Sequence, residues 1–139
     1  MDAFDADVLI YAAVASHDLG RRVRALFPVE PVEGRVGIGS VLLVPEILTK
    51  PLREDATEEF NELSALLGRL DLLPTDAATA QLATALGAAY GLRAADAVHL
   101  ATAVGAGATR FLTNNRSDFP KSITEIDVVY PNELAEPDP

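Results

Sequence analysis

The 139-residue sequence contains no cysteine, which excludes disulfide bonds, thiolate metal sites and cysteine nucleophiles. It also lacks a long apolar run, because its longest uninterrupted apolar stretch, from Val8 to Ala15, is far too short to cross a bilayer. No basic segment precedes that stretch, so a secretory signal is not expected. We therefore expect a cytoplasmic protein that does not associate with a membrane.

Basic residues are scarce as well. Eleven Lys and Arg stand against 21 Asp and Glu, which gives a formal net charge of -10 and a pI near 4.5. A protein that binds nucleic acid mainly by neutralising phosphates is normally basic on at least one face. A nucleic-acid substrate would therefore be held through a metal ion and a few arginines. An acidic protein of this kind also suits a basic partner protein.

The residues that are present are typical of one globular domain of the α/β class. The chain is 49% apolar and 23% charged, and its length suffices for a single good core. Short apolar runs alternate with stretches of helical periodicity, which predicts an α/β fold. We expect the domain to cover residues 1–130. Residues 131–139 form an acidic, proline-rich tail that we expect to be loosely held.

Turn residues and apolar periodicity place the individual elements. Five strands are expected, at residues 3–5, 35–39, 70–73, 109–113 and 125–130. Six helices are expected: one from Ala6, one capped by Asp18 and ending at Phe27, one capped by Ser40 and stopped by Pro51, one from Asp55, one capped by Thr75 or Asp76 with Gly91 as a left-handed stop, and one from about Arg93. The stretch from Pro28 to Gly34 is expected to be a solvated loop.

Four carboxylates far apart in the sequence each stand beside a short apolar run: Asp5, Glu46, Asp96 and Asp118. A fold that gathers them would build a half-buried cluster of negative charge, which is costly unless a cation lies between the acids. For ligands that offer only oxygen, that cation is most often Mg²⁺ or Mn²⁺. Such ions are suited to the attack of water on a phosphodiester. The four acids therefore predict a metal-dependent nuclease.

Each of these acids also has a structural explanation. Asp5 would serve as a helix cap, Asp96 would complement a helix dipole, and Asp118 would accept hydrogen bonds in a turn. Glu46 would occupy the exposed face of an amphipathic helix. The near absence of other polar residues from Val41 to Leu48 weakens that explanation: the stretch is expected to be largely buried, where an unpartnered glutamate is rare. His99, three residues after Asp96, is expected to pack or to form a hydrogen bond in preference to acting as a base.

Together, these segments resemble the PIN-domain family, and within it the VapC-like toxins of type II toxin–antitoxin systems. Two positions depart from the common pattern: Asp7 stands where Asn or Ser is frequent, and Asn115 stands where many members carry an acid that a subset places at Asp118. The resemblance covers residues 3–130 and is carried by four motifs in chain order: Asp5 with Val8-Leu9-Ile10-Tyr11, Ser40 with Glu46, Asp96-Ala97-Val98-His99-Leu100-Ala101-Thr102-Ala103, and Thr113-Asn114-Asn115 with Asp118-Phe119.

The resemblance implies a small α/β ribonuclease with a central, mainly parallel sheet and an acidic Mg²⁺ or Mn²⁺ site. It implies RNA as the substrate, a cognate antitoxin protein that covers the site, and a homodimer formed through the apolar helices near 60–70 and 82–90. The implied metal ligands are Asp5, Glu46, Asp96 and Asp118. Residues that would orient a ligand or contact substrate are Asp7, Thr113, Asn115 and Arg116.

Two other functions remain open at this point. A catalytically weak PIN-like domain that mainly binds a partner protein is favoured by Asn115 and by the low arginine content. A haloacid-dehalogenase-like phosphatase is suggested by Asp5-Ala6-Asp7-Val8, in which the first aspartate would attack phosphate. That family also needs a lysine and a later acid pair, and neither Lys50 nor Lys121 has a plausible setting. The sequence indicates neither the RNA target nor the number of metal ions.

Overall fold

The computed structural model describes residues 1–28 and 34–137 of the chain. Most of the expected loop from Pro28 to Gly34 therefore lies outside the described residues. The elements within them, in chain order, are β1 (Asp2–Phe4), α1 (Ala6–Ala12), α2 (Asp18–Arg24), β2 (Gly37–Ser40), α3 (Leu43–Arg53), α4 (Thr57–Leu67), β3 (Leu70–Leu73), α5 (Ala77–Tyr90), α6 (Ala94–Gly105), β4 (Arg110–Leu112), β5 (Asp127–Val129) and the short 3₁₀ helix η1 (Pro131–Glu133).

The five strands form one sheet in the order β3-β2-β1-β4-β5, and every neighbouring pair is parallel. This confirms the expected α/β fold with a five-stranded parallel sheet. The strand order runs outward from β1 in both directions, so β1 lies where the order reverses. In open α/β sheets, ligands bind beyond the carboxyl ends of the strands at such a switch point. Asp5 directly follows β1 and so stands at that point.

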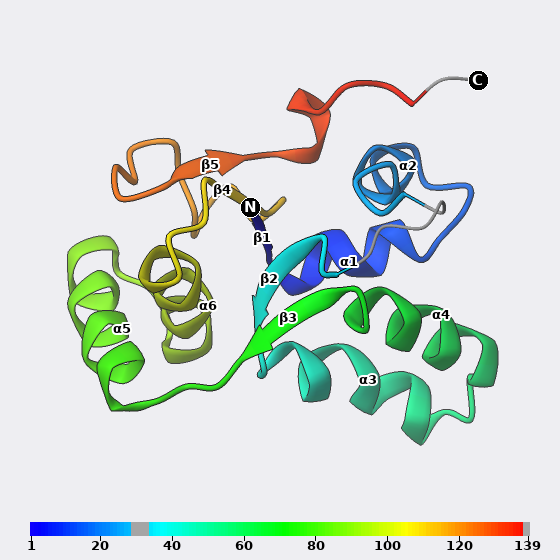
Figure 1. Cartoon of the computed structure of the whole chain (residues 1–139), viewed down its shortest axis with the longest axis horizontal. Helices are drawn as coiled ribbons and strands as arrows, with labels where there is room; N and C mark the ends of the chain where they lie inside the picture. Colours follow the sequence, from blue (N-terminus) through cyan, green and yellow to red (C-terminus); the bar gives the residue numbers. More distant parts are fainter. Residues whose placement is uncertain (29–33, 138–139) are drawn as a thin grey trace.

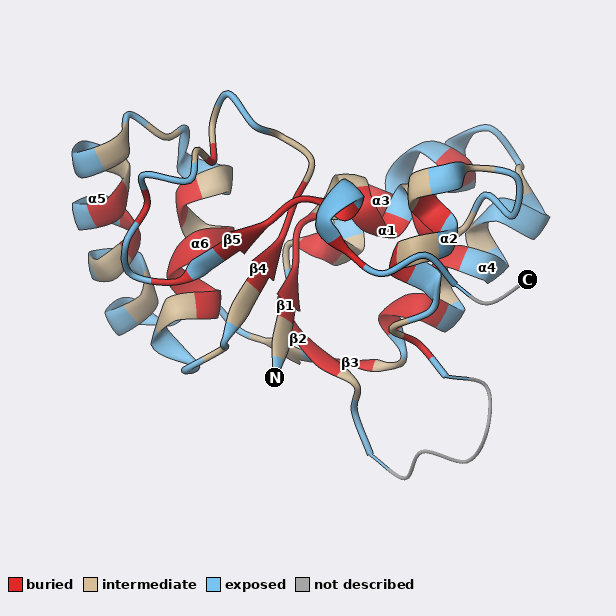
Figure 2. Cartoon of the chain, turned by 90° about the horizontal axis from the view of Figure 1, so that it is seen from above, coloured by how far each residue is buried: buried red, intermediate tan, exposed pale blue. Residues whose placement is uncertain are grey.

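Helices cover both faces of the sheet. Helices α5 and α6 lie on one face, and α1 to α4 lie on the other (Figure 1). Neighbouring residues of a strand point to opposite faces, so Phe4 joins the core beneath α1 to α4 while Ala3 joins the core beneath α6. Figure 2 shows the buried residues concentrated in the strands and on the inner sides of these helices. No helix among the described residues has the length and apolar character needed to span a membrane.

Helix α2 begins differently from the expectation. Its N-cap is His17, whose Nδ1 accepts a hydrogen bond from the backbone N–H of Gly20 at 3.0 Å, so Asp18 is the first helical residue and not the cap. The helix ends at Arg24, before the expected end at Phe27. An unprotonated imidazole nitrogen thus takes the role that a short polar side chain usually has at this position.

Helix α3 also departs from the expected bounds. Ser40 ends β2 and its Oγ accepts from the backbone N–H of Leu42 at 3.1 Å, so it holds the turn before the helix without being the N-cap. Pro51 lies inside the last turn of α3 and does not stop it; its ring is buried, and it donates no helical hydrogen bond. Gly91 has φ 65° after α5, which confirms the expected left-handed stop.

The expectation of a loosely held tail is wrong for its first part. Pro131 and Leu134 are buried, and η1 follows β5 directly. Arg22 of α2 donates to the carbonyl oxygens of Asn132 and Leu134 at 3.1 and 2.9 Å and pairs with Glu136 at 2.8 Å. The folded domain therefore extends past residue 130. The last two residues lie outside the described ranges.

Candidate active site

Asp5 is a buried carboxylate at the centre of the sheet edge, with only 6% of its surface exposed. It is the N-cap of α1, and its Oδ1 accepts from the backbone N–H of Ala6 at 2.8 Å. Its Oδ2 accepts from the Thr113 hydroxyl, also at 2.8 Å. Burial raises the pKa of Asp5, and the charge of Glu46 adds to that rise, while the bond from Thr113 opposes it. Asp5 is thus both the expected cap and an acid whose charge is only partly compensated.

Asp7 lies beside Asp5 in the first turn of α1. Its Oδ2 accepts from the backbone N–H of Asn114 at 3.0 Å, whereas its Oδ1 is buried and has no hydrogen-bond partner among the described residues. Burial and the charge of Asp5 raise the pKa of Asp7 to about 6. Buried polar atoms are rarely left unpaired, so this oxygen is an acceptor whose hydrogen-bonding capacity the described residues do not fill.

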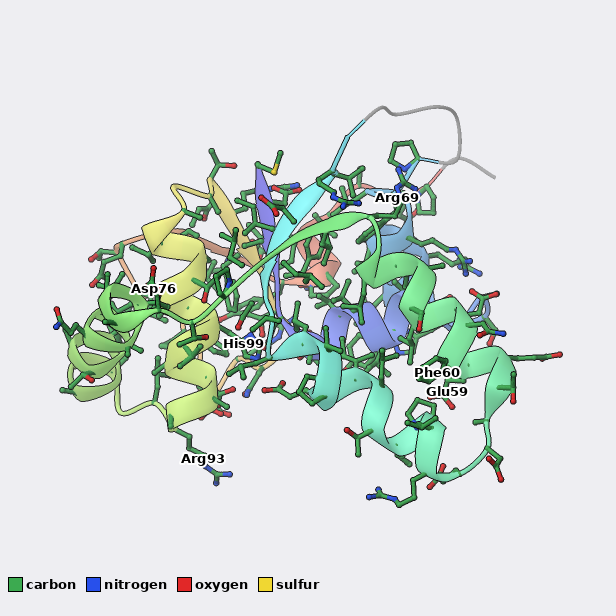
Figure 3. The ribbon with its side chains drawn as sticks, turned by 60° about the horizontal axis from the view of Figure 1, so that its bottom comes forward. Glu59, Phe60, Arg69, Asp76, Arg93 and His99 are labelled. Carbon is green, nitrogen blue, oxygen red and sulfur yellow. The ribbon has the colours of Figure 1, made fainter. Side chains whose placement is uncertain are left out.

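Glu46 lies in the first turn of α3, and its side chain is 34% exposed, so the expectation of a largely buried residue is wrong. Its Oε1 lies 3.0 Å from Nε2 of His99, whose side chain is only 1% exposed. Figure 3 shows His99 on α6, turned toward the start of α3. The Nδ1 of His99 has no partner among the described residues, so the bond to Glu46 assigns the ring proton to Nε2. His99 therefore has the expected hydrogen-bonding role.

Asp96 lies in the first turn of α6. It is partly buried, and within the described part of the chain no hydrogen bond is made to its carboxylate. Burial raises the pKa of Asp96, and the charges of Asp5 and Asp118 raise it further. The position of Asp96 in the first helical turn agrees with the structural explanation, but the neighbouring negative charges show that it also belongs to the acid cluster.

Asp118 lies in the turn after β4, where Asn115 holds it. The side-chain N–H₂ of Asn115 donates to Asp118 Oδ2 at 2.8 Å, and Asn115 Oδ1 accepts from the backbone N–H of Asp118 at 3.3 Å. The backbone N–H of Asn115 in turn donates to Thr113 Oγ1 at 3.1 Å. Asn115 therefore does not replace an acid directly; it orients the acid three residues later.

Arg116 is not brought into the site. Its guanidinium lies 4.5 Å from the centroid of the Tyr130 ring, and its Nη2 donates to Asn132 Oδ1 at 2.9 Å. These contacts tie it to the carboxyl-terminal segment, so the expected contact of Arg116 with substrate has no support in the structure. Nothing in the sequence pattern connected Arg116 with Tyr130 or Asn132.

The acids of four separate segments thus influence one another at the carboxyl edge of the sheet. Their side chains are nevertheless not assembled as a ligand shell: among residues 1–28 and 34–137, no three His, Cys, Asp or Glu side chains stand where they could hold one metal ion. Two of the carboxylates already have hydrogen-bond partners, Glu46 at His99 and Asp118 at Asn115. The donor set is made of carboxylate oxygens, which is the chemistry that Mg²⁺ and Mn²⁺ prefer.

The family model for the PIN domain matches residues 3–121, most of the chain. The chain belongs to the PIN-domain family. This membership agrees with the order of the acidic motifs along the sequence. It leaves the phosphatase interpretation without support, and Lys121, one of the two lysines, is bonded to the carbonyl oxygen of Val128 and to Glu133.

Two solved structures share the fold of this PIN-domain chain. A toxin–antitoxin complex from Klebsiella pneumoniae contains a chain of 22% identity and a TM-score of 0.70, with 94% of this chain and 98% of that chain covered. VapBC2 from Rickettsia felis bound to a DNA fragment from its promoter gives 16% identity and a TM-score of 0.70, with 93% and 97% covered. At such identities the likeness shows the fold alone. No curated protein sequence matches the chain.

The surfaces expected to form a homodimer are largely used inside the PIN domain itself. Leu63, Leu66 and Leu67 of α4 are buried in the core beneath the sheet, and Leu86 of α5 is buried against α6. The helix face that these residues form is therefore not free to contact a second copy. The homodimer stays a prediction without an assigned surface.

Proposed function

We propose that this chain is a divalent-metal-dependent endoribonuclease and the toxin of a toxin–antitoxin pair. The observation that carries the proposal is the buried Asp5 at the strand-order switch point. Its negative charge raises the pKa of Asp7 and of Asp96, and the negative charge of Glu46 raises the pKa of Asp5. Within the described residues, no Lys or Arg forms an ion pair with any of these acids. A site of this charge is expected to recruit a cation.

The residues fit Mg²⁺ or Mn²⁺ in the chemistry of their donors. Asp5, Glu46 and Asp96 would hold the ion, and Asp118 would complete the site. The ion, when bound, lowers the pKa of a water molecule and neutralises charge that builds up on the phosphate. The remaining work falls to this chain: hydrogen bonds from Thr113 and Asn115 orient carboxylates, as the bonds around metal ligands commonly do.

An assay of RNA cleavage tests the enzymatic part of this proposal. Purified protein is incubated with single-stranded and structured RNA in Mn²⁺ or Mg²⁺ and, separately, in EDTA, with single-stranded DNA and an aryl phosphate as further substrates. We expect cleavage of RNA only with the metal, and its loss in Asp96→Asn. The matched control is Asp71→Asn, which neutralises an exposed aspartate on β3. Cleavage in EDTA, or full activity of Asp96→Asn, would contradict the proposal.

The alternative of a catalytically weak, partner-binding domain makes a different prediction for the same protein. Asn115 no longer favours that alternative, because it orients Asp118 through two hydrogen bonds. A domain without nuclease function has no need for these aligned acids and should bind Mn²⁺ poorly. Calorimetric titration with Mn²⁺ therefore separates the two functions, even when no RNA substrate has been identified.

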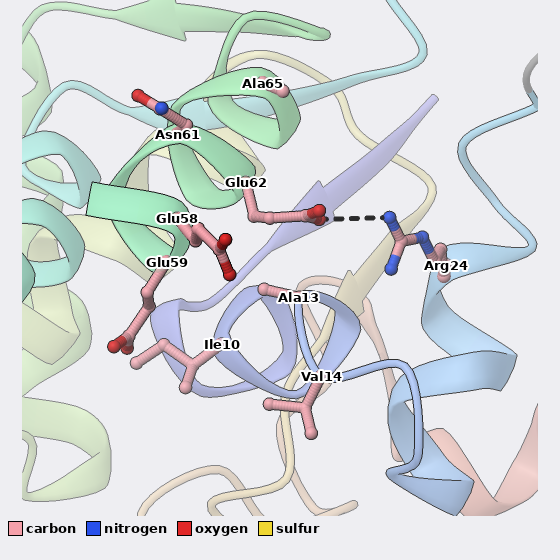
Figure 4. A pocket seen from close by; sticks show the side chains of 9 residues that line it. All are labelled: Ile10, Ala13, Val14, Arg24, Glu58, Glu59, Asn61, Glu62 and Ala65. Carbon is pink, nitrogen blue, oxygen red and sulfur yellow. Dashed lines mark hydrogen bonds and ion pairs between the residues drawn. The ribbon is translucent and has the colours of Figure 1, made fainter. Parts of the chain in front are cut away.

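A groove between α1, α2 and α4 supports the antitoxin as partner (Figure 4). Its volume is about 810 Å³. The floor includes Ile10 and Val14, which are 39% and 47% exposed and are therefore unusually accessible apolar side chains. One wall carries the three glutamates of α4: Glu58, Glu59 and Glu62.

The glutamates and exposed apolar side chains of the groove indicate what kind of partner segment it would bind. Only Glu62 has a cationic partner there, since Arg24 pairs with it at 3.1 Å as Figure 4 shows. Glu58 and Glu59 form no ion pair within the described part of the chain. A partner segment with one apolar face and flanking Lys or Arg would cover Ile10 and neutralise these two glutamates. An amphipathic helix of a basic antitoxin has this character.

Co-expression tests the partner. The product of a small open reading frame next to the gene is co-expressed with the protein, and the complex is purified and measured. We expect a stable complex that Glu59→Lys weakens at least tenfold, whereas Glu54→Lys, an exposed charge reversal just beyond α3, leaves it intact. The absence of such a frame, or equal binding by both variants, would contradict this part of the proposal while leaving the nuclease unaffected.

A further inference from the structure

The turn that carries Asp118 is anchored on its far side by Tyr130. The Tyr130 hydroxyl donates to the carbonyl oxygen of Phe119 at 2.7 Å, and both residues are buried. Phe119 is fully buried and packs edge-on against Phe111 of β4, with ring centroids 5.0 Å apart. The residue next to Asp118 in the chain is therefore fixed through both its side chain and its backbone.

Two cations from the same loop gather at the ring of Tyr130. The guanidinium of Arg116 lies 4.5 Å from the ring centroid and the Nζ of Lys121 lies 4.8 Å from it. Cations within about 6 Å of an aromatic face are attracted by the ring quadrupole. These two residues stand on either side of Asp118 in the sequence, so the segment between them is held against the ring at both ends.

The chain after Tyr130 completes the attachment. Glu133 Oε1 accepts from the backbone N–H of Tyr130 at 2.9 Å and pairs with Lys121 at 2.6 Å. Asn132 Oδ1 accepts from Arg116 at 2.9 Å. Arg22 of α2 then binds the carbonyl oxygens of Asn132 and Leu134 and the carboxylate of Glu136. Residues 130–136, which we call the carboxyl-terminal strap, thus connect α2 with the loop after β4.

We propose that Tyr130 is a positioning residue for Asp118, and that the carboxyl-terminal strap, secured by Arg22, holds the Asn115–Asp118 turn in place at the acid site. Among the described residues, no hydrogen bond or ion pair joins the strap to Asp5 or Asp96, so the strap has no part in the chemistry itself. Its effect reaches the turn through the bond from Tyr130 to Phe119 and through the contacts of Arg116 and Lys121 with Tyr130, Asn132 and Glu133. The importance of Asp118 for metal binding rests on the proposed function, whereas the mechanical role of the strap does not.

The first test compares Tyr130→Phe with Tyr90→Phe in the full chain. Both variants remove one hydroxyl, but the Tyr90 hydroxyl bonds to the exposed Glu125, away from the turn. Amide hydrogen exchange in metal-free buffer is followed at Asn115 and Phe119, whose N–H groups bond to Thr113 Oγ1 and to the Asn115 carbonyl oxygen. We expect Tyr130→Phe to exchange about fivefold faster at these two amides, the factor that corresponds to one ordinary hydrogen bond.

The same two variants are titrated with Mn²⁺. We expect binding by Tyr130→Phe to be weaker by a similar factor and binding by Tyr90→Phe to equal that of the wild type. A general loss of stability would accelerate exchange across the sheet as well, so the amides of β1 serve as the internal reference. Unchanged exchange at Asn115 and Phe119 in Tyr130→Phe would overturn the positioning role.

A second pair of variants tests the strap at its other end, remote from the acids. Arg22→Gln removes the bonds to the strap, while Arg21→Gln removes only a surface pair with Asp18 on the same helix. We expect Arg22→Gln, and not Arg21→Gln, to accelerate exchange at Phe119. Wild-type exchange in Arg22→Gln would overturn the role of the strap. A wild-type protein that binds no Mn²⁺ would instead contradict the proposed function, and the exchange data would still decide the inference.

Discussion

Neutralising Asp7 should make the metal-free protein more stable at neutral pH, which is unusual for a substitution of a partly buried residue. Asp7→Asn keeps an oxygen that can accept from the backbone N–H of Asn114, and it removes a negative charge that burial and Asp5 both disfavour. The other carboxylate oxygen of Asp7 has no partner among the described residues, so the charge gains little in return.

The magnitude follows from the pKa. The pKa of Asp7 rises from 3.8 to about 6 on folding, a change of about two units, and each unit is worth about 1.4 kcal/mol. Because the folded-state pKa is raised, the contribution of Asp7 to stability is fully present below about pH 4 and is lost as the pH rises through about 6. The free energy of unfolding of the wild type should therefore be about 3 kcal/mol lower at pH 8 than at pH 4 because of Asp7. This figure is an upper limit, since relaxation of the site would reduce it.

Urea unfolding in EDTA, measured between pH 4 and pH 8, is the assay. The stability difference between Asp7→Asn and the wild type should be near its minimum at pH 4 and should grow by up to about 3 kcal/mol by pH 8, a midpoint shift of about 1 M or more. Any fixed structural cost of the amide cancels in this comparison. Asp71→Asn, at an exposed position on β3, is the control. A difference that does not change with pH would refute the reasoning.

Three further outcomes are expected. Asp96→Asn should abolish RNA cleavage and raise metal-free stability at pH 7, because burial and the charge of Asp5 raise the pKa of Asp96; cleavage assays and urea unfolding check both effects. His99→Leu should weaken Mn²⁺ binding by about 10- to 100-fold in calorimetry, because Glu46 loses its orienting bond, and His99→Gln should recover part of the loss. Phe119→Ala should cost about 3–5 kcal/mol in denaturant unfolding, since it empties a fully buried ring site.

Each of these outcomes has a result that would count against it. Destabilisation by Asp96→Asn in EDTA would mean that other groups of the folded protein stabilise the negative charge of Asp96. Equal Mn²⁺ affinity in His99→Leu and the wild type would show that Glu46 needs no orientation or binds no metal. A small effect of Phe119→Ala, comparable to that of a surface substitution, would mean that the turn after β4 is not anchored in the core.

The place of the site was predictable because the carboxyl ends of parallel strands lie at the same edge of the sheet, so the residues that follow them lie there too. Asp5 directly after β1 and Thr113 directly after β4 meet for this reason, and short apolar runs mark both strands in the sequence. The left-handed end of α5 was equally predictable, since Gly91 is the residue type that this conformation favours. Local chemistry and strand direction decide these features, so one sequence suffices.

The partners of the acids were not predictable in the same way. Glu46 was expected to be buried, but the inward stripe of α3 is formed by Leu43, Ile47 and Pro51, and Glu46 lies between these positions at the helix surface. Its contact with His99 joins residues 53 positions apart. Such pairs depend on how helices on opposite faces of the sheet are placed at its carboxyl edge, which no local pattern encodes.

The error about the tail has a related cause. Residues 131–139 are rich in proline and acids, and composition alone favours a loose segment. The order of this segment comes from Arg22, more than 100 residues earlier, and from the ring of Tyr130. One arginine side chain holds the segment by donating hydrogen bonds to its backbone carbonyl oxygens. The pattern of hydropathy and charge along the sequence does not reveal such a contact.

The central proposal is that acids of four segments bind divalent metal at the carboxyl edge of the sheet, with Asp118 completing a first or a second ion site. Crystals soaked in Mn²⁺ and measured for anomalous scattering test it most directly. The expected result is a peak in contact with carboxylate oxygens of Asp5 and Asp96, with Glu46 bridging between His99 and the ion. A map with no peak there, or with a peak only at the groove glutamates Glu58 and Glu59, would contradict the claim.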